Sequence, residues 1–278
     1  MQKLLIVGAG GAIGTEITNY LFDNQVAREK FSKIYLLDQR NDFELSNEQN
    51  FECLSQPVDT LTNIHEFDHI IDVSGCNSPG ASFETSVNDV LKTERIIRRI
   101  AQNPACRYVM LLHSARSETS FGDVIRWKEE LVQRSNIGNV SIKMVHSPFI
   151  LTPYASPSSF GAIVVRIIDA LSRNRNYIEV DSEETINTKW IDPKSVVEIL
   201  LERIERKSRV VEHIIHSHIC AIEDILTITL RQFNYLGPFF LFQPKLDEIK
   251  FEIEDIQYDH WKAPLVATIK HIVEVLHG

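Results

Sequence analysis

Residues 4–14 read Leu-Leu-Ile-Val-Gly-Ala-Gly-Gly-Ala-Ile-Gly, a short apolar run that leads into a glycine-rich turn. The apolar run predicts a buried strand, and the residues from Thr15 onward have the apolar spacing of a helix. Glycine is required where a turn is tight, where the backbone must approach a ligand, and where a helix lies close to a strand. A plain strand-to-helix turn is the other interpretation. In this context we expect a helix N-terminus that holds the diphosphate of a dinucleotide.

An acidic residue ends the next apolar run. Asp38 follows Leu36 and Leu37, at the position where a carboxylate accepts hydrogen bonds from the adenosine ribose. Its charge favours NAD and repels a 2′-phosphate, although Arg40 offers a route to NADP; a solvated turn residue is the alternative. The cofactor contacts expected here are Gly8, Gly10, Gly11, Ala12, Ile13, Gly14, Asp38, Gln39 and Arg40.

The N-terminal half alternates compact apolar runs with helical patterns, which is typical of βαβ units that build a parallel sheet. We therefore predict an α/β fold: a Rossmann-type doubly wound parallel sheet with a small C-terminal substrate lobe. The core is expected to span residues 1–150 and 186–220, and the lobe residues 151–185 and 221–278. Strands are predicted at 3–7, 33–37, 69–73, 107–112, 141–146 and 210–219, and helices at 13–23, 87–101, 124–134 and 194–205.

Composition narrows the function classes. The 278 residues carry a net charge of −9, which opposes nucleic-acid binding. No apolar run is long enough for a membrane span, so we expect no membrane association. The four cysteines are scattered without a Cys-x-x-Cys pair, which indicates neither a disulfide framework nor a metal site and favours a reducing, cytoplasmic setting.

The spacing Gly8-x-x-Gly11-x-x-Gly14 resembles the short-chain dehydrogenase/reductase superfamily, in particular its extended (nucleotide-sugar epimerase/dehydratase) and atypical branches. Further similar positions are Asp72-Val73-Ser74-Gly75, Asn88, Ser114, the helix from Val124 to Leu131 with Lys128, the loop His146-Ser147-Pro148-Phe149, and Trp190-Ile191-Asp192-Pro193. The resemblance implies that Ser74, Gly75 and Pro148 contact the cofactor. It also implies that Lys128 holds the nicotinamide ribose and that Ser114 binds the substrate oxygen.

The catalytic tyrosine of the family's Tyr-x-x-x-Lys pattern is replaced here by Val124. Three substitutes for the lost acid are His113, Lys128 itself, and Glu118 or Asp123 from the preceding loop. The alternatives are a buried structural role for His113, a surface position for Lys128, and a capping role for Ser114.

Three other patterns invite functional interpretations. Tyr258 and Lys262 have the Tyr-x-x-x-Lys spacing but lie near the C-terminus, outside the expected core. On a single strand 210–219, His213 would face away from His216 and His218, which argues against a shared metal ion. The last pattern is a set of arginines in the lobe that could bind an acidic group or form a solvated helix face: Arg166, Arg173 and Arg175.

The leading hypothesis is an atypical oxidoreductase of this kind that binds NAD(H) and acts on a small or nucleotide-linked carbonyl or alcohol. Nicotinamide would supply the hydride chemistry. The alternatives are a non-catalytic dinucleotide-binding protein, acting in redox sensing or scaffolding, and a nucleotide-sugar epimerase or dehydratase. A homodimer through the helices that flank the sheet is a further expectation from the resemblance.

Overall fold

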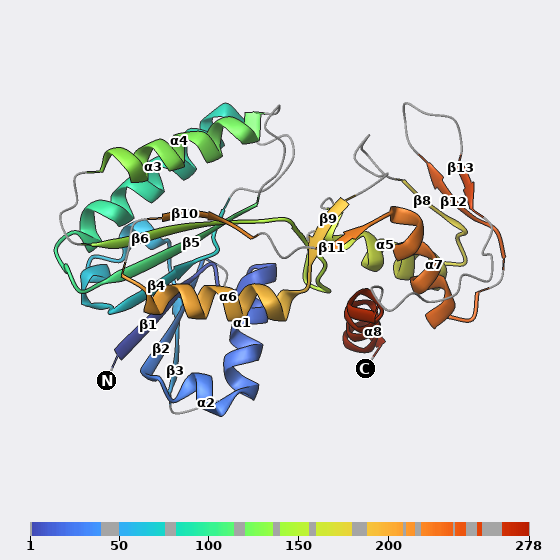
Figure 1. Cartoon of the computed structure of the whole chain (residues 1–278), viewed down its shortest axis with the longest axis horizontal. Helices are drawn as coiled ribbons and strands as arrows, with labels where there is room; N and C mark the ends of the chain where they lie inside the picture. The colour runs from blue at the N-terminus through green and yellow to red at the C-terminus, as the bar shows by residue number, and fades with distance from the viewer. Residues whose placement is uncertain are drawn as a thin grey trace. The chain divides into compact units, whose positions relative to one another are not determined.

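The chain folds into two units (Figure 1). Unit 1 comprises Met1–Pro148 and Pro193–Ile215, and unit 2 comprises Phe149–Asp192 and His216–Gly278. The computed structural model describes residues 2–39, 50–75, 82–113, 120–135, 140–155, 160–179, 188–207, 210–214, 218–235, 237–242, 249–251 and 263–277.

Unit 1 is built on a seven-stranded sheet in which every neighbouring pair of strands is parallel. The strand order is β10-β6-β5-β4-β1-β2-β3. The order reverses direction at β1, so chain connections leave to opposite sides there, as in a doubly wound fold. The strands are β1 (Gln2–Val7), β2 (Phe31–Asp38), β3 (Phe51–Ser55), β4 (His69–Asp72), β5 (Arg107–His113), β6 (Ser141–Ser147) and β10 (Val210–His213).

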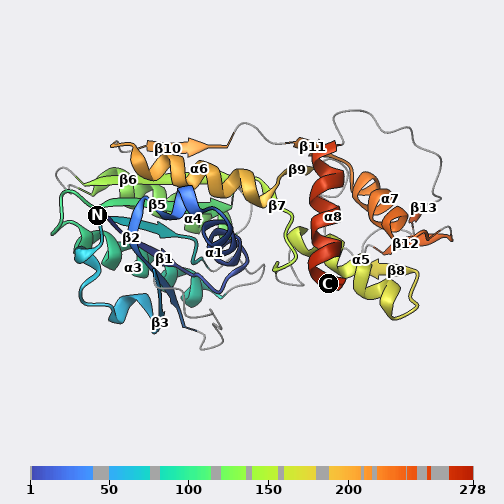
Figure 2. The ribbon, with the colours of Figure 1, turned by 90° about the horizontal axis from the view of Figure 1, so that it is seen from below.

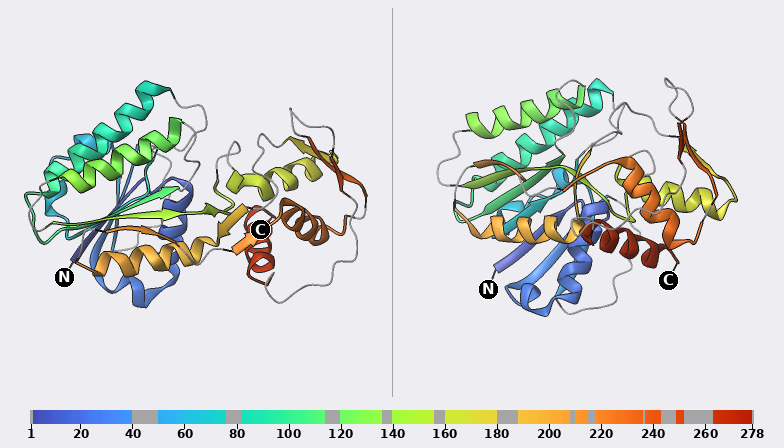
Figure 3. Two further views of the ribbon diagram at one scale, coloured as in Figure 1. Left: turned by 45° about the horizontal axis from the view of Figure 1, so that its top comes forward. Right: turned by 45° about the vertical axis from the view of Figure 1, so that its right-hand side comes forward.

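Helices cover both faces of this sheet, which explains why its central strands are continuous apolar runs. Helices α3 and α4 lie on one face, and α1 and α6 lie on the other (Figures 1 and 3). The core on the α3 and α4 side includes Leu5, Val7, Ile70, Ile97 and Val132. The helices of unit 1 are α1 (Ala12–Asp23), α2 (Gln25–Arg28), α3 (Phe83–Ile100), α4 (Ser120–Arg134) and α6 (Pro193–Glu205), with 3₁₀ turns η1 (Val58–Thr60) and η2 (Ile64–Glu66).

In its described residues, unit 2 combines the α-helices α5, α7 and α8 with two small sheets (Figure 2). Its core gathers apolar residues of α5, α7 and α8, among them Ile167, Leu226 and Ile269. One sheet has the order β11-β9-β7 and the other β13-β12-β8. The elements are β7 (Phe149–Ile150), η3 (Phe160–Ala162), α5 (Ile163–Ser172), β8 (Tyr177–Glu179), β9 (Thr188–Ile191), β11 (His218–Cys220), α7 (Ile222–Gln232), β12 (Phe239–Phe242), β13 (Ile249–Phe251) and α8 (Ala263–His277).

The predicted α/β class and doubly wound parallel sheet are confirmed, with two corrections to the strands. The single strand predicted at 210–219 is wrong: Val210 pairs in parallel with Lys143 of β6, whereas His218 pairs in antiparallel fashion with Trp190 of β9. His213 and His218 therefore belong to different sheets, and the facing argument made for them does not apply. Strand β3 escaped prediction because it is a short edge strand whose residues are all at least partly exposed.

Two predicted helices begin four residues earlier than their sequence patterns indicated. Helix α3 begins at Phe83 rather than Val87, because the Ser82 hydroxyl caps it and accepts a hydrogen bond from the Thr85 N–H at 3.1 Å. Helix α4 begins at Ser120 rather than Val124. Across the described residues, no helix is both long and apolar enough to cross a membrane.

Candidate functional site

The turn after β1 requires glycine at its first position. Gly8 has a φ of +83°, a conformation that residues with a side chain rarely adopt. A Cβ atom at Gly8 would also lie 2.8 Å from both Cα and Cβ of Ser74. The N–H groups of Gly8 and Ala9 both donate to the Leu37 carbonyl of β2, at 2.8 and 3.1 Å. The turn is therefore fixed between the ends of β2 and β4.

The helix that follows lies against this turn without room for side chains. A Cβ atom at Gly14 would lie 2.1 Å from the Gly8 carbonyl oxygen and 2.5 Å from the Ala9 Cα. Gly11 is the N-cap of α1, and its Cβ would be 3.1 Å from the same Gly8 oxygen. In the described chain, α1 has no side-chain cap at its N-terminus and no acidic residue in its first turn. Such an N-terminus attracts an anion, so the turn fits the diphosphate of a dinucleotide.

Asp38 ends β2 beside the glycine turn. Its Oδ2 accepts a hydrogen bond from the Gly10 N–H at 3.0 Å, so the carboxylate lies against the loop and is only partly exposed. Gln39 is exposed, and Arg40 lies outside the described residues. The structure thus brings Asp38 together with the predicted glycines, as a ribose-binding carboxylate requires.

The end of β4 carries a second polar group. Ser74 donates through its N–H and its hydroxyl to Asp72 Oδ1, at 2.9 and 2.6 Å. The other oxygen, Asp72 Oδ2, accepts a hydrogen bond at 2.8 Å from the Tyr108 hydroxyl of β5. Burial, reinforced by the Asp72 charge, raises the pKa of Tyr108 well above its usual value. This phenol therefore stays protonated at neutral pH and holds Asp72 in place.

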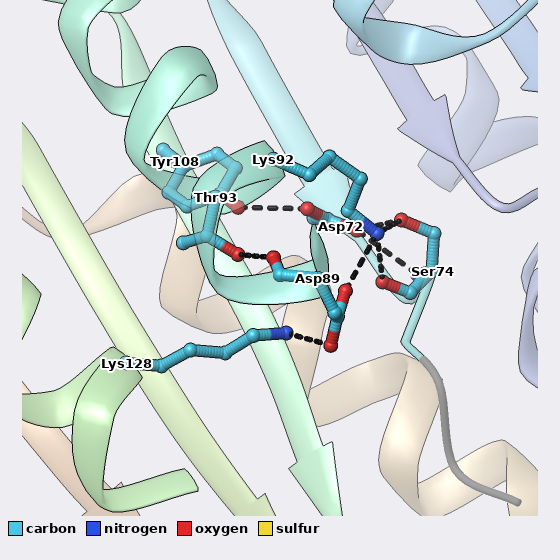
Figure 4. Close-up of polar contacts among 7 residues, drawn as sticks. All are labelled: Asp72, Ser74, Asp89, Lys92, Thr93, Tyr108 and Lys128. Carbon is cyan, nitrogen blue, oxygen red and sulfur yellow. Dashed lines mark hydrogen bonds and ion pairs between the residues drawn. The ribbon is translucent and has the colours of Figure 1, made fainter. Parts of the chain in front are cut away.

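Two lysines share one buried carboxylate next to this group (Figure 4). Lys128 of α4 donates to Asp89 Oδ2 of α3 at 2.6 Å, and these side chains are 2% and 6% exposed. Lys92, one turn further along α3, forms an ion pair with Asp89 Oδ1 at 3.0 Å. Burial alone would raise the pKa of Asp89, but the two ammonium groups outweigh burial and lower it.

Sequence reasoning missed Asp89, Lys92 and Tyr108, and it named Asp72 only as part of a motif, without its hydrogen bonds to Ser74 and Tyr108. It named Asn88 as the helix asparagine, but Asn88 is exposed and its neighbour Asp89 faces inward. The helical spacing indicates that Asp89 is buried, because it lies on the same face of α3 as the buried residues Thr93, Ile96, Ile97 and Ile100.

The structure describes only some of the other residues that were predicted to take part in catalysis or cofactor binding. His113 ends β5 at the same edge of the sheet, Val124 is 4% exposed on α4, and Pro148 follows β6. Among the side chains that the structure describes, no cluster of three or more His, Cys, Asp or Glu could hold a metal ion. Outside the described positions lie Ser114, Glu118, His216, Tyr258 and Lys262, and the side chains of His113, Asp123, His213 and His218 are likewise not described.

The lobe arginines are engaged in local contacts or exposed. Arg166 donates to the Glu179 carbonyl at 3.0 Å, and Arg173 forms an ion pair with Asp169 at 2.9 Å. Arg175 is exposed and lines a surface hollow of about 480 Å³ together with residues such as Tyr235. The binding of an acidic group by these arginines stays a prediction.

In sequence, the chain matches no protein-family model and no curated protein. Solved structures, however, share its fold over nearly the whole chain. UDP-N-acetylglucosamine 4-epimerase from Methanobrevibacter ruminantium M1, in complex with UDP-N-acetylmuramic acid, matches with a TM-score of 0.75 at 12% identity, covering 99% of each chain.

Two further structures match to a similar extent. UDP-glucuronic acid 4-epimerase from Bacillus cereus, in complex with NAD, has a TM-score of 0.73 at 13% identity, covering 98% of this chain and 99% of that one. The NAD-dependent NDP-hexosamine 5,6-dehydratase TunA has a TM-score of 0.71 at 15% identity, covering 99% of this chain and 98% of that one. The chain therefore shares the fold of nucleotide-sugar epimerases and dehydratases.

Proposed function

We propose that this protein binds NAD(H) at the glycine turn and acts as an oxidoreductase on a nucleotide-linked carbonyl or alcohol. The observation that carries the proposal is the glycine turn after β1, where a Cβ atom on Gly8, Gly11 or Gly14 would lie too close to neighbouring atoms. Backbone N–H groups at the mouth of α1 then hold the diphosphate. When bound, nicotinamide supplies the hydride chemistry.

Asp38 supports NAD over NADP. Its carboxylate is fixed next to the loop by the Gly10 N–H, and from there it accepts hydrogen bonds from the adenosine ribose hydroxyls. A 2′-phosphate at the same place would meet a negative charge. The epimerase from Bacillus cereus, which shares the fold, was solved with NAD bound.

The substrate class is inferred from the fold and not from a described pocket. The fold neighbours named above act on nucleotide-linked sugars, which supports a nucleotide-linked substrate and makes a nucleotide-sugar epimerase or dehydratase the second candidate. The assignments of Ser114, His113 and Lys128 to catalysis stay predictions.

A non-catalytic dinucleotide-binding protein is the third candidate, and one observation favours it. The resemblance places Val124 where the family has its catalytic tyrosine, and Val124 is buried. Tyr108 donates a hydrogen bond to Asp72 and has a raised pKa, so it is a poor base. An enzyme would therefore need its acid or base from another group, and the candidates named from the sequence are His113, Lys128, and Glu118 or Asp123.

A binding titration tests the shared premise. The purified chain should quench or shift NADH fluorescence on binding, with weaker binding of NADPH. Asp38→Ala should lower NADH affinity by about tenfold, the loss expected for hydrogen bonds to a charged group. Asp59→Asn, on the exposed η1 turn, is the matched control and should bind as wild type does. If wild type binds neither dinucleotide, the proposal fails.

A second experiment separates the three candidates. Wild-type protein is incubated with a panel of UDP- and TDP-linked sugars, once with NAD and once with NADH, and the products are identified by mass and by nuclear magnetic resonance. Net formation of NADH or NAD supports the oxidoreductase, isomerised or dehydrated sugar without net redox change supports the epimerase or dehydratase, and tight NADH binding without any product supports the non-catalytic candidate.

The expected homodimer is retained as a proposal. Phe83, at the start of α3, is 73% exposed although its ring meets Trp127 of α4 edge-on, at a centroid separation of 6.1 Å. A second copy of the chain would cover this apolar position. Sedimentation of wild type as a dimer and of Phe83→Glu as a monomer would support this interface, whereas a wild-type monomer would exclude it.

A further inference from the structure

Lys92 extends from α3 to the carboxyl end of β4. Its Nζ donates to the carbonyl oxygen of Ser74 at 2.9 Å and to the Ser74 hydroxyl at 3.0 Å (Figure 4). Asp89 anchors the same ammonium through an ion pair at 3.0 Å. A positive charge is thereby fixed at the edge of the sheet where strands β1, β2 and β4 end.

Ser74 links this charge to the glycine turn. The turn is so close to Ser74 that a Cβ on Gly8 would lie 2.8 Å from the Ser74 Cα. Strands β2 and β4 flank β1 on opposite sides, and Asp38 ends β2. A dinucleotide whose adenosine ribose meets Asp38 and whose diphosphate crosses the turn continues toward β4, so its nicotinamide half approaches Lys92.

Lys92 is better placed for this contact than Lys128. The Lys92 side chain is 22% exposed, whereas the Lys128 side chain is 2% exposed and directed at Asp89. One Lys92 N–H group can change partner at small cost, because the Ser74 hydroxyl keeps its own hydrogen bond to Asp72 when Lys92 releases it.

We propose that Lys92 presents its ammonium group to the nicotinamide half of the dinucleotide, the role that the sequence resemblance assigns to Lys128. The inference rests on the proposed function, since it needs a dinucleotide in the glycine turn. Lys128 then neutralises Asp89 through Oδ2, while Lys92 pairs with Oδ1. The expected contact is a charge-assisted hydrogen bond to a phosphate or ribose oxygen.

The test compares two probes, NADH and AMP, by calorimetry on the full-length chain. AMP carries only the adenosine half. Lys92→Met should lower NADH affinity by about tenfold, as for a lost hydrogen bond to a charged group, and leave AMP affinity within about twofold. Lys92→Arg, which keeps the charge, should retain most of the NADH affinity. Asp38→Ala should weaken both probes, which shows that AMP reports the adenosine half.

Arg95→Met is the matched control, because Arg95 lies one turn further along α3 in an exposed ion pair with Asp59. It should bind both probes as wild type does. If Lys92→Met does not fold, Lys92→Gln carries the same expectation.

Three results would overturn the inference. In the first, wild type binds NADH and the Lys92 variant has an NADH affinity within about twofold of wild type. That result removes the role of Lys92 but leaves the proposed function standing. The second is an equal loss of AMP and NADH affinity, which indicates a general structural effect. The third is a wild type that binds no NADH, which removes the proposed function as well.

Discussion

Replacing Lys128 by methionine removes one member of the buried Asp89 ion pair and keeps most of the side-chain volume. Lys128 Nζ lies 2.6 Å from Asp89 Oδ2, and both side chains are almost fully buried. Removing one partner of such a pair leaves an uncompensated charge and costs about 3–5 kcal/mol. Lys92 still faces Asp89 at 3.0 Å, so the loss is expected near the lower limit, about 3 kcal/mol.

That loss should be visible as a shift in melting temperature. For a domain of this size each kcal/mol lowers Tm by about 2–4 °C, so about 3 kcal/mol corresponds to a decrease of roughly 6–12 °C. The assay is thermal and urea unfolding of the full chain at neutral pH, followed by far-ultraviolet circular dichroism. The first transition is compared among variants, because two units can unfold separately.

The matched control is Lys30→Met. Lys30 pairs with Glu205 in the same unit at 2.5 Å, but both side chains are 52% exposed. An exposed ion pair contributes about 0–1 kcal/mol, so this variant should melt close to wild type. If Lys128→Met loses less than about 1 kcal/mol, or no more than the Lys30 variant, the interpretation of Lys128 as a buried structural cation is refuted.

Three further predictions concern the turn and the polar groups around it. Gly14→Ala places a Cβ 2.1 Å from the Gly8 oxygen; it should destabilise the chain by about 1–3 kcal/mol in urea unfolding, and unchanged stability would contradict the packing described. The pKa of Asp89 is lowered from 3.8 in the folded chain, so the charged carboxylate contributes stability above that pH, and this contribution is lost as the pH falls through the folded-state pKa. Asp89→Asn should therefore reduce the loss of Tm in acid. Identical profiles of Tm against pH for wild type and variant would contradict this role of Asp89. Tyr108→Phe removes the donor 2.8 Å from Asp72 Oδ2 and should cost about 1–3 kcal/mol, whereas a fully stable variant would show that the hydrogen bond contributes little.

The features that follow from local sequence were predicted well. The glycine turn is encoded by consecutive residues, because a strand, a turn that excludes Cβ atoms and a helix must follow one another directly, and Asp38 directly ends the next strand. The central strands were equally readable, since burial on both faces makes each of them an apolar run.

The features that depend on pairing between distant segments were not predicted. The strand expected at 210–219 divides because β10 and β11 have different partners, β6 and β9. The sequence analysis assigned no role to Asp89, because its ion pair forms only when α4 brings Lys128 to within 2.6 Å of its carboxylate. Lys92 was overlooked for the same reason, since its Ser74 contact spans 18 residues of chain.

A structure of the protein determined with NAD bound is the most direct test of dinucleotide binding at the glycine turn. We expect density for the diphosphate within hydrogen-bond distance of the backbone N–H groups at the start of α1, with the adenosine ribose at Asp38. A dinucleotide bound anywhere else on the chain, with the glycine turn filled by protein atoms, would contradict it.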